Sequence, residues 1–131
     1  MLKTGNRSPY YPVHVSQSLV DDFKQALKLP SSAPLPPTLP IYWMFTLNYP
    51  WRDQIPHPLV HGRQSCHYEQ DLEVGRDYWL QFELKKVRPM TRDGRHSLMI
   101  EQIMTGYDEE KQTVFQATSL LITYPDKGGN D

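Results

Sequence analysis

A short apolar segment near the middle of the chain constrains the fold more than any other feature. Residues 41–47 read IYWMFTL, and a helix of this sequence is apolar on nearly every side. Thr38 stands where a helix N-cap belongs, and Pro40 suits the first helical turn. A helix without a polar face must be covered by other structure on most of its sides. We therefore predict a central, almost wholly buried helix over residues 40–48.

An amphipathic helix is predicted ahead of this segment. Apolar residues recur there at helical spacing, at Leu19, Val20, Phe23, Ala26 and Leu27. Ser16 or Ser18 stands at the N-cap position, and Ser18 forms a capping-box-like pair with Asp21. Pro30 ends this helix. Residues 30–40 contain five prolines, so we expect an ordered, polyproline-like connection to the apolar helix.

The rest of the chain has the patterns of β-strands. A short strand is predicted over residues 10–15, and four long strands follow residue 58, over residues 62–71, 78–85, 98–105 and 113–124. One apolar helix followed by four long strands predicts an α+β hot-dog fold, in which a curved antiparallel sheet wraps the helix. A generic α+β sandwich with both helices side by side on the sheet is the alternative. Strand lengths of about ten residues favour the curled sheet.

The charge balance excludes several classes of partner. The chain has 14 Lys and Arg against 15 Asp and Glu, with both signs interspersed, so neither nucleic acid nor an anionic membrane is an expected partner. No window approaches transmembrane length, the start does not resemble a signal peptide, and the lone Cys66 points to a reducing compartment. We expect a cytoplasmic protein with a disordered lead over residues 1–9, one domain over residues 10–124 and a tail over residues 125–131.

Three segments, in this order, resemble a known family. Residues 33–40 (APLPPTLP) lead into the apolar helix, residues 59–64 read LVHGRQ, and residues 68–75 (YEQDLEVG) precede a long strand. Together they resemble the MaoC-like hot-dog dehydratases, and more narrowly the type that forms the amino-terminal half of two-hot-dog acyl dehydratases and the fatty-acid-synthase-type dehydratase region. The resemblance covers residues 10–124. It implies reversible hydration of a 2-enoyl thioester to the (R)-3-hydroxyacyl form, with an acyl thioester of coenzyme A or acyl carrier protein as the ligand and no further cofactor.

The resemblance also identifies what this chain lacks. Active members of the family place Asp and His in an Asp-x-Asn-Pro-x-His stretch between the first helix and the central helix, where the two groups act as general acid and base. The corresponding residues 27–40 contain no Asp, Glu or His. We therefore expect a non-catalytic hot-dog unit that shapes the acyl tunnel. It would form a homodimer, or a heterodimer with a catalytic hot-dog subunit.

Two other hypotheses stay open, a stand-alone enzyme with displaced catalytic groups and a non-enzymatic acyl-thioester binder. His61 is the first catalytic candidate because it opens a long strand beside Gly62, where backbone could approach a ligand. A structural histidine bonded to nearby backbone groups is the alternative. The candidate substrate-binding residues are His61, Gly62 and Gln64, together with Arg92 and Arg95, which would meet phosphates from the loop between the second and third long strands.

The remaining reactive side chains have plainer interpretations. Asp53 lies beyond the end of the central helix, so catalysis by its carboxylate is not expected. His57 and His61 have ligand spacing, but they flank Pro58 and do not share a helix face, so no metal site is predicted. Cys66 alternates with its strand neighbours and is expected to be a small core residue.

Overall fold

The structure is a computed structural model that describes residues 2–55, 59–92 and 94–123. Its elements in chain order are β1 (Tyr11–His14), α1 (Gln17–Ala26), α2 (Leu39–Thr46), the short 3-10 helix η1 (Arg52–Gln54), β2 (Leu59–Tyr68), β3 (Asp77–Arg92), β4 (Arg95–Tyr107) and β5 (Thr113–Thr123). Every helix and strand expected from the sequence is present. β3 and β4 run further than their sequence patterns predict, and together they form one long hairpin.

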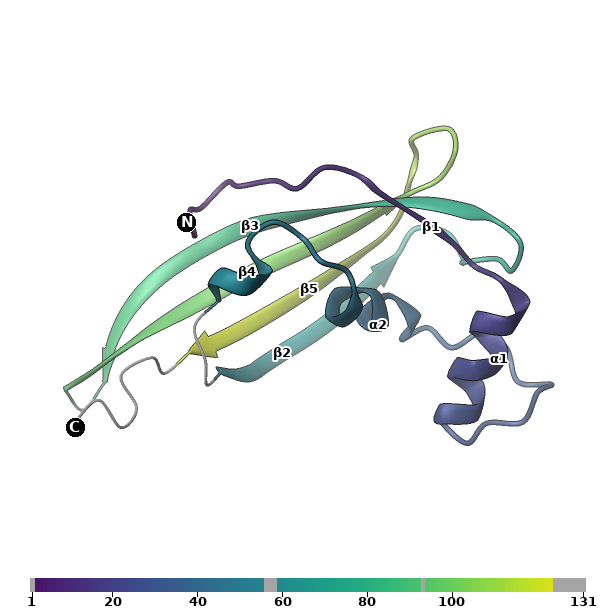
Figure 1. Cartoon of the computed structure of the whole chain (residues 1–131), viewed down its shortest axis with the longest axis horizontal. Coiled ribbons are helices and arrows are strands. Elements are labelled where there is room, and N and C mark those ends of the chain that lie inside the picture. The colour runs from purple at the N-terminus through teal and green to yellow at the C-terminus, as the bar shows by residue number, and fades with distance from the viewer. Residues whose placement is uncertain (1, 56–58, 93, 124–131) are drawn as a thin grey trace.

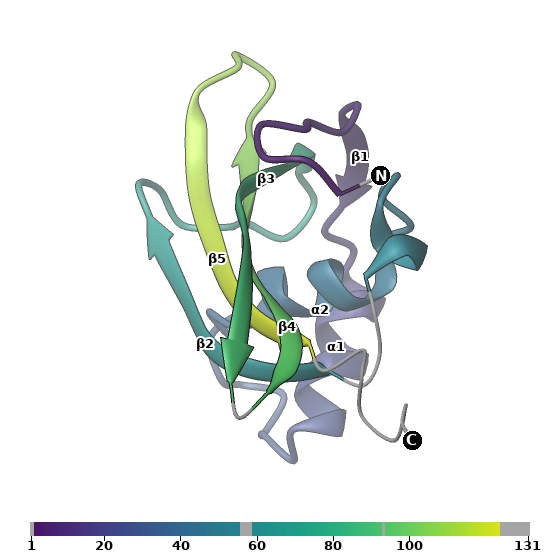
Figure 2. The ribbon, with the colours of Figure 1, turned by 90° about the vertical axis from the view of Figure 1, so that its left-hand side faces the viewer.

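The strands form one antiparallel sheet in the order β1-β3-β4-β5-β2 within the described residues. Figures 1 and 2 show that the sheet curves and that α1 and α2 lie on the same side of it. Register shifts between Leu84 and Lys86 in β3, and between His61 and Arg63 in β2, are β-bulges that increase this bend. The arrangement confirms the predicted hot-dog fold.

β3 shows why the sheet has one apolar face. Tyr78, Leu80, Phe82 and Leu84 are fully buried, whereas the residues between them are half-exposed. Successive side chains of a strand point to opposite faces, so this alternation places one set of side chains on the core. The alternation predicted over residues 78–85 is confirmed.

The burial of α2 differs from the prediction. Trp43 and Met44 are buried, and the ring of Trp43 stacks on that of Phe115 at a centroid distance of 6.2 Å. Tyr42 and Phe45, however, are 40% and 48% exposed. The sheet covers one side of the helix, and Phe23 of α1 meets the ring of Tyr42 edge-on at a centroid distance of 6.0 Å. The prediction of an almost wholly buried helix is therefore wrong for the single chain, whose outward side keeps exposed aromatic surface.

α1 is tied to the proline-rich connection that follows it. Ser16, rather than Ser18, is the N-cap, because its Oγ accepts a hydrogen bond from the backbone N–H of Leu19 at 3.0 Å. Near the end of the helix, the Nζ of Lys24 donates to the carbonyl of Ser31 at 3.1 Å. The connection expected to be ordered is therefore held against the helix that it leaves.

The N-terminal residues differ from the disordered lead expected over residues 1–9. The backbone N–H of Gly5 donates a hydrogen bond to the carbonyl of Leu84 at 2.7 Å. The backbone N–H of Ser8 donates to the carbonyl of Phe82 at 2.9 Å. The buried hydroxyl of Ser8 in turn accepts from the N–H of Phe82 at 2.8 Å. β3 is longer than β1, so its remaining edge amides need partners, and this segment provides them. The boundary at residue 124 and the tail expected over residues 125–131 fall outside the described residues.

Candidate functional site

A cavity of about 550 Å³ lies between the end of α2 and the concave face of the sheet. Its helix side is formed by Met44, Phe45, Tyr49, Arg52, Asp53 and Ile55. Its sheet side is formed by Gln64, Gln102, Ser119 and Leu121. The cavity therefore uses α2, η1 with its flanking loop, and the strands β2, β5 and β4, which are neighbours in the sheet.

Three polar side chains form a row across the sheet side of the cavity. Gln64 of β2 is the register partner of Ser119 of β5, and Ser119 is the register partner of Gln102 of β4. The Nε2 of Gln64 donates to the Oγ of Ser119 at 3.3 Å, and that Oγ lies 3.9 Å from the sulfur of Met44. The mainly apolar inner face of the sheet thus has a polar strip next to Met44 of α2.

Gln102 is fixed by two aromatic side chains that follow α2. The Nε1 of Trp51 donates to the Oε1 of Gln102 at 2.8 Å, and both residues are buried. Burial raises the pKa of the Tyr49 hydroxyl, and its hydrogen bond to Gln102 and the charge of Arg52 offset this only in part. Tyr49 therefore stays a neutral hydroxyl at neutral pH. This network holds the segment after α2 against β4.

The charged groups of the lining are Arg52 and Asp53, which both belong to η1. The guanidinium of Arg52 donates to the carbonyls of Phe45 at 2.8 Å and Leu47 at 3.3 Å, which satisfies acceptors at the end of α2. Asp53 is exposed and provides the carboxylate among the described lining residues. From the sequence, the position of Asp53 beyond the end of the central helix argued against a catalytic role. In the structure, the same position brings Asp53 to the cavity.

The structure places the predicted substrate-binding residues in different parts of the molecule. Gln64 lines the cavity. Gly62 lies in the bulge of β2, where an added Cβ would make only ordinary contacts with Leu120 at 3.6 Å, so no close approach requires a glycine there. His61 is the backbone register partner of Leu121, which lines the cavity, and the side chain of His61 lies outside the described parts.

The predicted phosphate-binding pair is not brought to the cavity. Arg92 and Arg95 pair with each other at the tip of the β3–β4 hairpin, and their side chains lie outside the described parts. At about 3.3 Å per residue, Arg95 is roughly 20 Å along β4 from Gln102. Their contact with a phosphate stays a prediction.

Sequence reasoning missed most of the site, including the polar and aromatic residues Tyr49, Trp51, Gln102 and Ser119 that form or support its hydrogen-bond network. For the two on strands a signal exists, because each is polar at a position where the strand alternation predicts an apolar, inward side chain. Tyr49 and Trp51 lie in a loop without periodicity, so no sequence pattern indicates their role.

Metal and thiol chemistry gain no support from the geometry. Within residues 2–55, 59–92 and 94–123, no group of three or more His, Cys, Asp or Glu side chains could hold a metal ion. Partial burial raises the pKa of the Cys66 thiol, which keeps it protonated and weakly nucleophilic. No helix in the described part of the chain is both long enough and apolar enough to cross a membrane.

Comparison with known proteins yields matches in structure alone. No protein-family model matches the sequence, and no curated protein does. The chain superposes on the HadBC (3R-hydroxyacyl-ACP dehydratase) complex from Mycobacterium tuberculosis with a TM-score of 0.67 and 14% identity, covering 91% of this chain and 96% of the other. It superposes on a MaoC-like dehydratase from Rhodospirillum rubrum with a TM-score of 0.67 and 9% identity, covering 94% of this chain and 93% of that one.

A third solved structure, the ChsH1-ChsH2 complex from Mycobacterium tuberculosis, gives a TM-score of 0.69 at 14% identity, with 92% of this chain and 85% of that chain covered. All three comparisons cover more than four fifths of both chains, so the similarity extends over the whole domain and not over a shared motif. The chain thus has the hot-dog fold of the MaoC-like dehydratases and of the HadBC and ChsH1-ChsH2 complexes.

Proposed function

We propose that this chain is an acyl-binding, non-catalytic subunit of a hot-dog hydratase or dehydratase system, with an acyl thioester of coenzyme A or acyl carrier protein as its ligand. The observation that carries the proposal is the cavity of about 550 Å³ between α2 and the sheet. Small-molecule sites have volumes of roughly 300–1,000 Å³, so the cavity has a suitable size. The naming of HadBC as a 3R-hydroxyacyl-ACP dehydratase supports this class of ligand.

The cavity walls suit the acyl part of such a ligand. Met44, Ile55 and Leu121 are buried apolar residues of the lining, and an acyl chain placed against them would bury its own apolar surface at about 25 cal/mol per Å². The polar strip of the sheet side is uncharged, and Gln64 and Ser119 bond to each other. A neutral chain therefore fits this surface better than a charged group does.

The catalytic pair is absent from the described lining. Hydration of an enoyl thioester needs an acid and a base that together hold one water molecule. The described lining contains Asp53 but no histidine, and residues 27–40 contain neither group. We therefore assign binding of the acyl group to this chain and the acid-base chemistry to a partner.

The surface near the cavity mouth indicates where such a partner would lie. Phe45 both lines the cavity and is 48% exposed, so a chain that covers Phe45 would also close the cavity. β2 is an edge of the sheet, and edge amides and exposed aromatic rings are surfaces that proteins cover by assembly. HadBC and ChsH1-ChsH2 were solved as complexes. We infer that a second hot-dog chain, identical or catalytic, covers this side.

The purified protein is expected to be a dimer or a larger assembly at micromolar concentration, measured by light scattering. Phe45→Lys places a charge on the covered surface and is expected to weaken the assembly by at least about tenfold in Kd, since burying an unpaired ammonium is costly. Val74→Lys is the matched control, because Val74 is also an exposed apolar residue at 42% but lies outside the cavity lining. A stable 15 kDa species for the unmodified chain contradicts the inference.

Binding of an acyl thioester is tested by filling the cavity. Ser119→Phe adds a ring between Gln64, Gln102 and Met44, where it takes the space of the acyl chain. We expect the variant to bind a non-hydrolysable acyl-CoA thioether at least about tenfold more weakly, with the Kd measured by calorimetry.

Ser119→Ala is the matched control for this experiment, since it removes the hydroxyl without filling the cavity, and its Kd should stay within about threefold of the unmodified protein. Thermal melting shows whether Ser119→Phe still folds. Met44→Trp, on the opposite wall, provides a second filled cavity. Unchanged affinity in two folded, filled variants would show that the acyl group does not bind in this cavity.

A further inference from the structure

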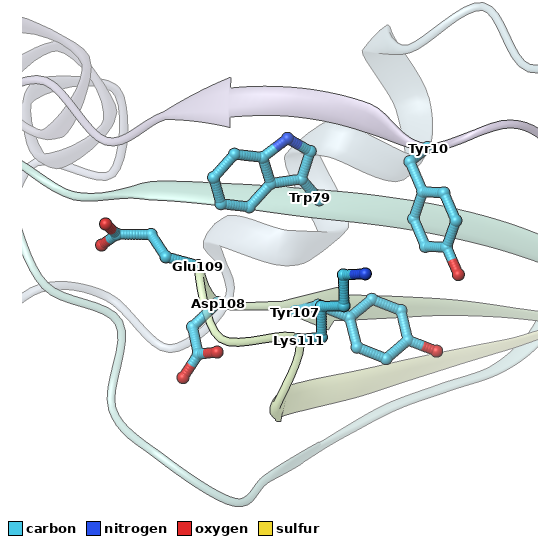
Figure 3. Close-up of a pocket in the computed structure, with 6 residues that line it drawn as sticks. All are labelled: Tyr10, Trp79, Tyr107, Asp108, Glu109 and Lys111. Atoms are coloured by element: carbon cyan, nitrogen blue, oxygen red, sulfur yellow. The ribbon is translucent and has the colours of Figure 1, made fainter.

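A second hollow, of about 460 Å³, lies on the outer face of the sheet (Figure 3). It is lined by Tyr10, Trp79, Tyr107, Asp108, Glu109 and Lys111. Trp79 stands between the buried Tyr78 and Leu80 of β3, so its side chain points away from the core that contains the acyl cavity. The outer pocket and the acyl cavity are therefore separated by the sheet.

Three aromatic rings from different segments form the walls of the outer pocket. Trp79 and Tyr107 are register partners on β3 and β4, and the ring of Tyr10 meets that of Tyr107 edge-on at a centroid distance of 5.8 Å. Tyr10 is 56% exposed, and Trp79 and Tyr107 are half-exposed. Exposed aromatic faces bind planar rings by stacking, at little cost in side-chain entropy.

The two carboxylates of the pocket are already engaged elsewhere. The Oδ1 of Asp108 accepts from the backbone N–H groups of Glu110 and Gln112, each at 2.9 Å, and these bonds, the one from Gln112 foremost, hold the pKa of the Asp108 carboxyl below its usual range. Glu109 lies 3.7 Å from the guanidinium of Arg76. Figure 3 shows both carboxylates pointing away from the three rings.

Lys111 is the charged group that faces the rings. Its amino group points toward the space between Trp79 and the two tyrosines (Figure 3), and among the described residues no carboxylate lies within 4.0 Å of it. Its backbone is held in the left-handed region, with φ of 64°, in the turn that Asp108 closes. The turn thus presents an ammonium beside three aromatic faces, with no carboxylate of the described residues paired to it.

We propose that the outer pocket binds a small planar aromatic ring that carries an anionic group, with the ring stacked on Trp79 and the anion on the ammonium of Lys111. Stacking and a charge-assisted contact act on different parts of such a ligand, so both are needed for full affinity. This proposal does not depend on the acyl cavity, which lies on the opposite face.

Calorimetry with two anionic probes tests the proposal on the full chain. Adenosine 5′-monophosphate and indole-3-acetate each join a planar aromatic ring to an anionic group, and adenosine and indole are the counterparts that lack the anionic group. We expect at least one anion to bind about fivefold more tightly than its neutral counterpart, with affinity that falls as salt rises. A preference for the nucleotide identifies a phosphate ligand, and a preference for indole-3-acetate identifies an aromatic carboxylate.

The variants separate the two contacts. Trp79→Leu is expected to weaken binding by about tenfold through lost stacking. Lys111→Asn is expected to remove the preference for the anion, because asparagine tolerates the left-handed backbone but carries no charge. Lys28→Asn is the matched control, since Lys28 has φ of 59° and lies outside the pocket. No binding of either anion, or equal anion preference in Lys111→Asn and Lys28→Asn, overturns the proposal.

Discussion

The purified chain on its own is expected to hydrate a crotonyl thioester at least about 10²-fold more slowly than the same chain mixed with a hot-dog partner that carries the Asp-x-Asn-Pro-x-His stretch. General acid and base groups contribute roughly 10²–10⁴-fold, and the described cavity lining lacks the pair. Loss of the enoyl absorbance measures the rate. The partner alone and the partner with the Ser119→Phe variant are the controls, because the proposed function requires this chain's cavity.

Turnover by the isolated chain at an ordinary enzyme rate would contradict this expectation and support displaced catalytic groups. Asp53 and His61 are then the groups to test, because Asp53 lines the cavity and His61 pairs with Leu121 on its sheet side. Loss of turnover in a folded Asp53→Asn or His61→Ala variant would show that the substituted residue takes part in catalysis.

A Gly106→Ala substitution is expected to lower the free energy of unfolding by about 2–3 kcal/mol, measured by urea denaturation. A Cβ at Gly106 would lie 2.3 Å from Cε2 of Phe115, its register partner on β5. The ring of Phe115 cannot move aside easily, because it is fully buried and contacts two other rings. Its centroid lies 6.2 Å from that of Trp43 and 6.0 Å from that of Tyr68. The clash therefore has to be absorbed by the core.

Gly62→Ala is the matched control for this experiment. Gly62 also lies on a strand, but an added Cβ there meets its nearest neighbours at 3.6 Å, so the expected change is within about 0.5 kcal/mol. Equal stability of the two variants would show that the ring of Phe115 is not held as described. Because Phe115 supports Trp43 of α2, folded protein of the Gly106→Ala variant should also bind the acyl ligand less tightly.

Local patterns in the sequence determined the elements and their faces. The alternation over residues 78–85 identified which side chains of β3 are buried, and the apolar run over residues 41–47 identified the helix that the sheet covers. These predictions succeed because strand and helix periodicity depend on neighbours within a few residues. The same sequence also determined that residues 27–40 contain no Asp, Glu or His.

The tertiary structure alone decided which side chains meet. Gln64, Ser119 and Gln102 form one strip because β2 pairs with β5 and β5 with β4 in one register, and a shift of one residue would turn each side chain to the opposite face. Trp51 and Gln102 bond across 51 positions of the chain. Periodicity indicates the face of a side chain but not its partner, since strand register is a property of the whole sheet and not of any one segment.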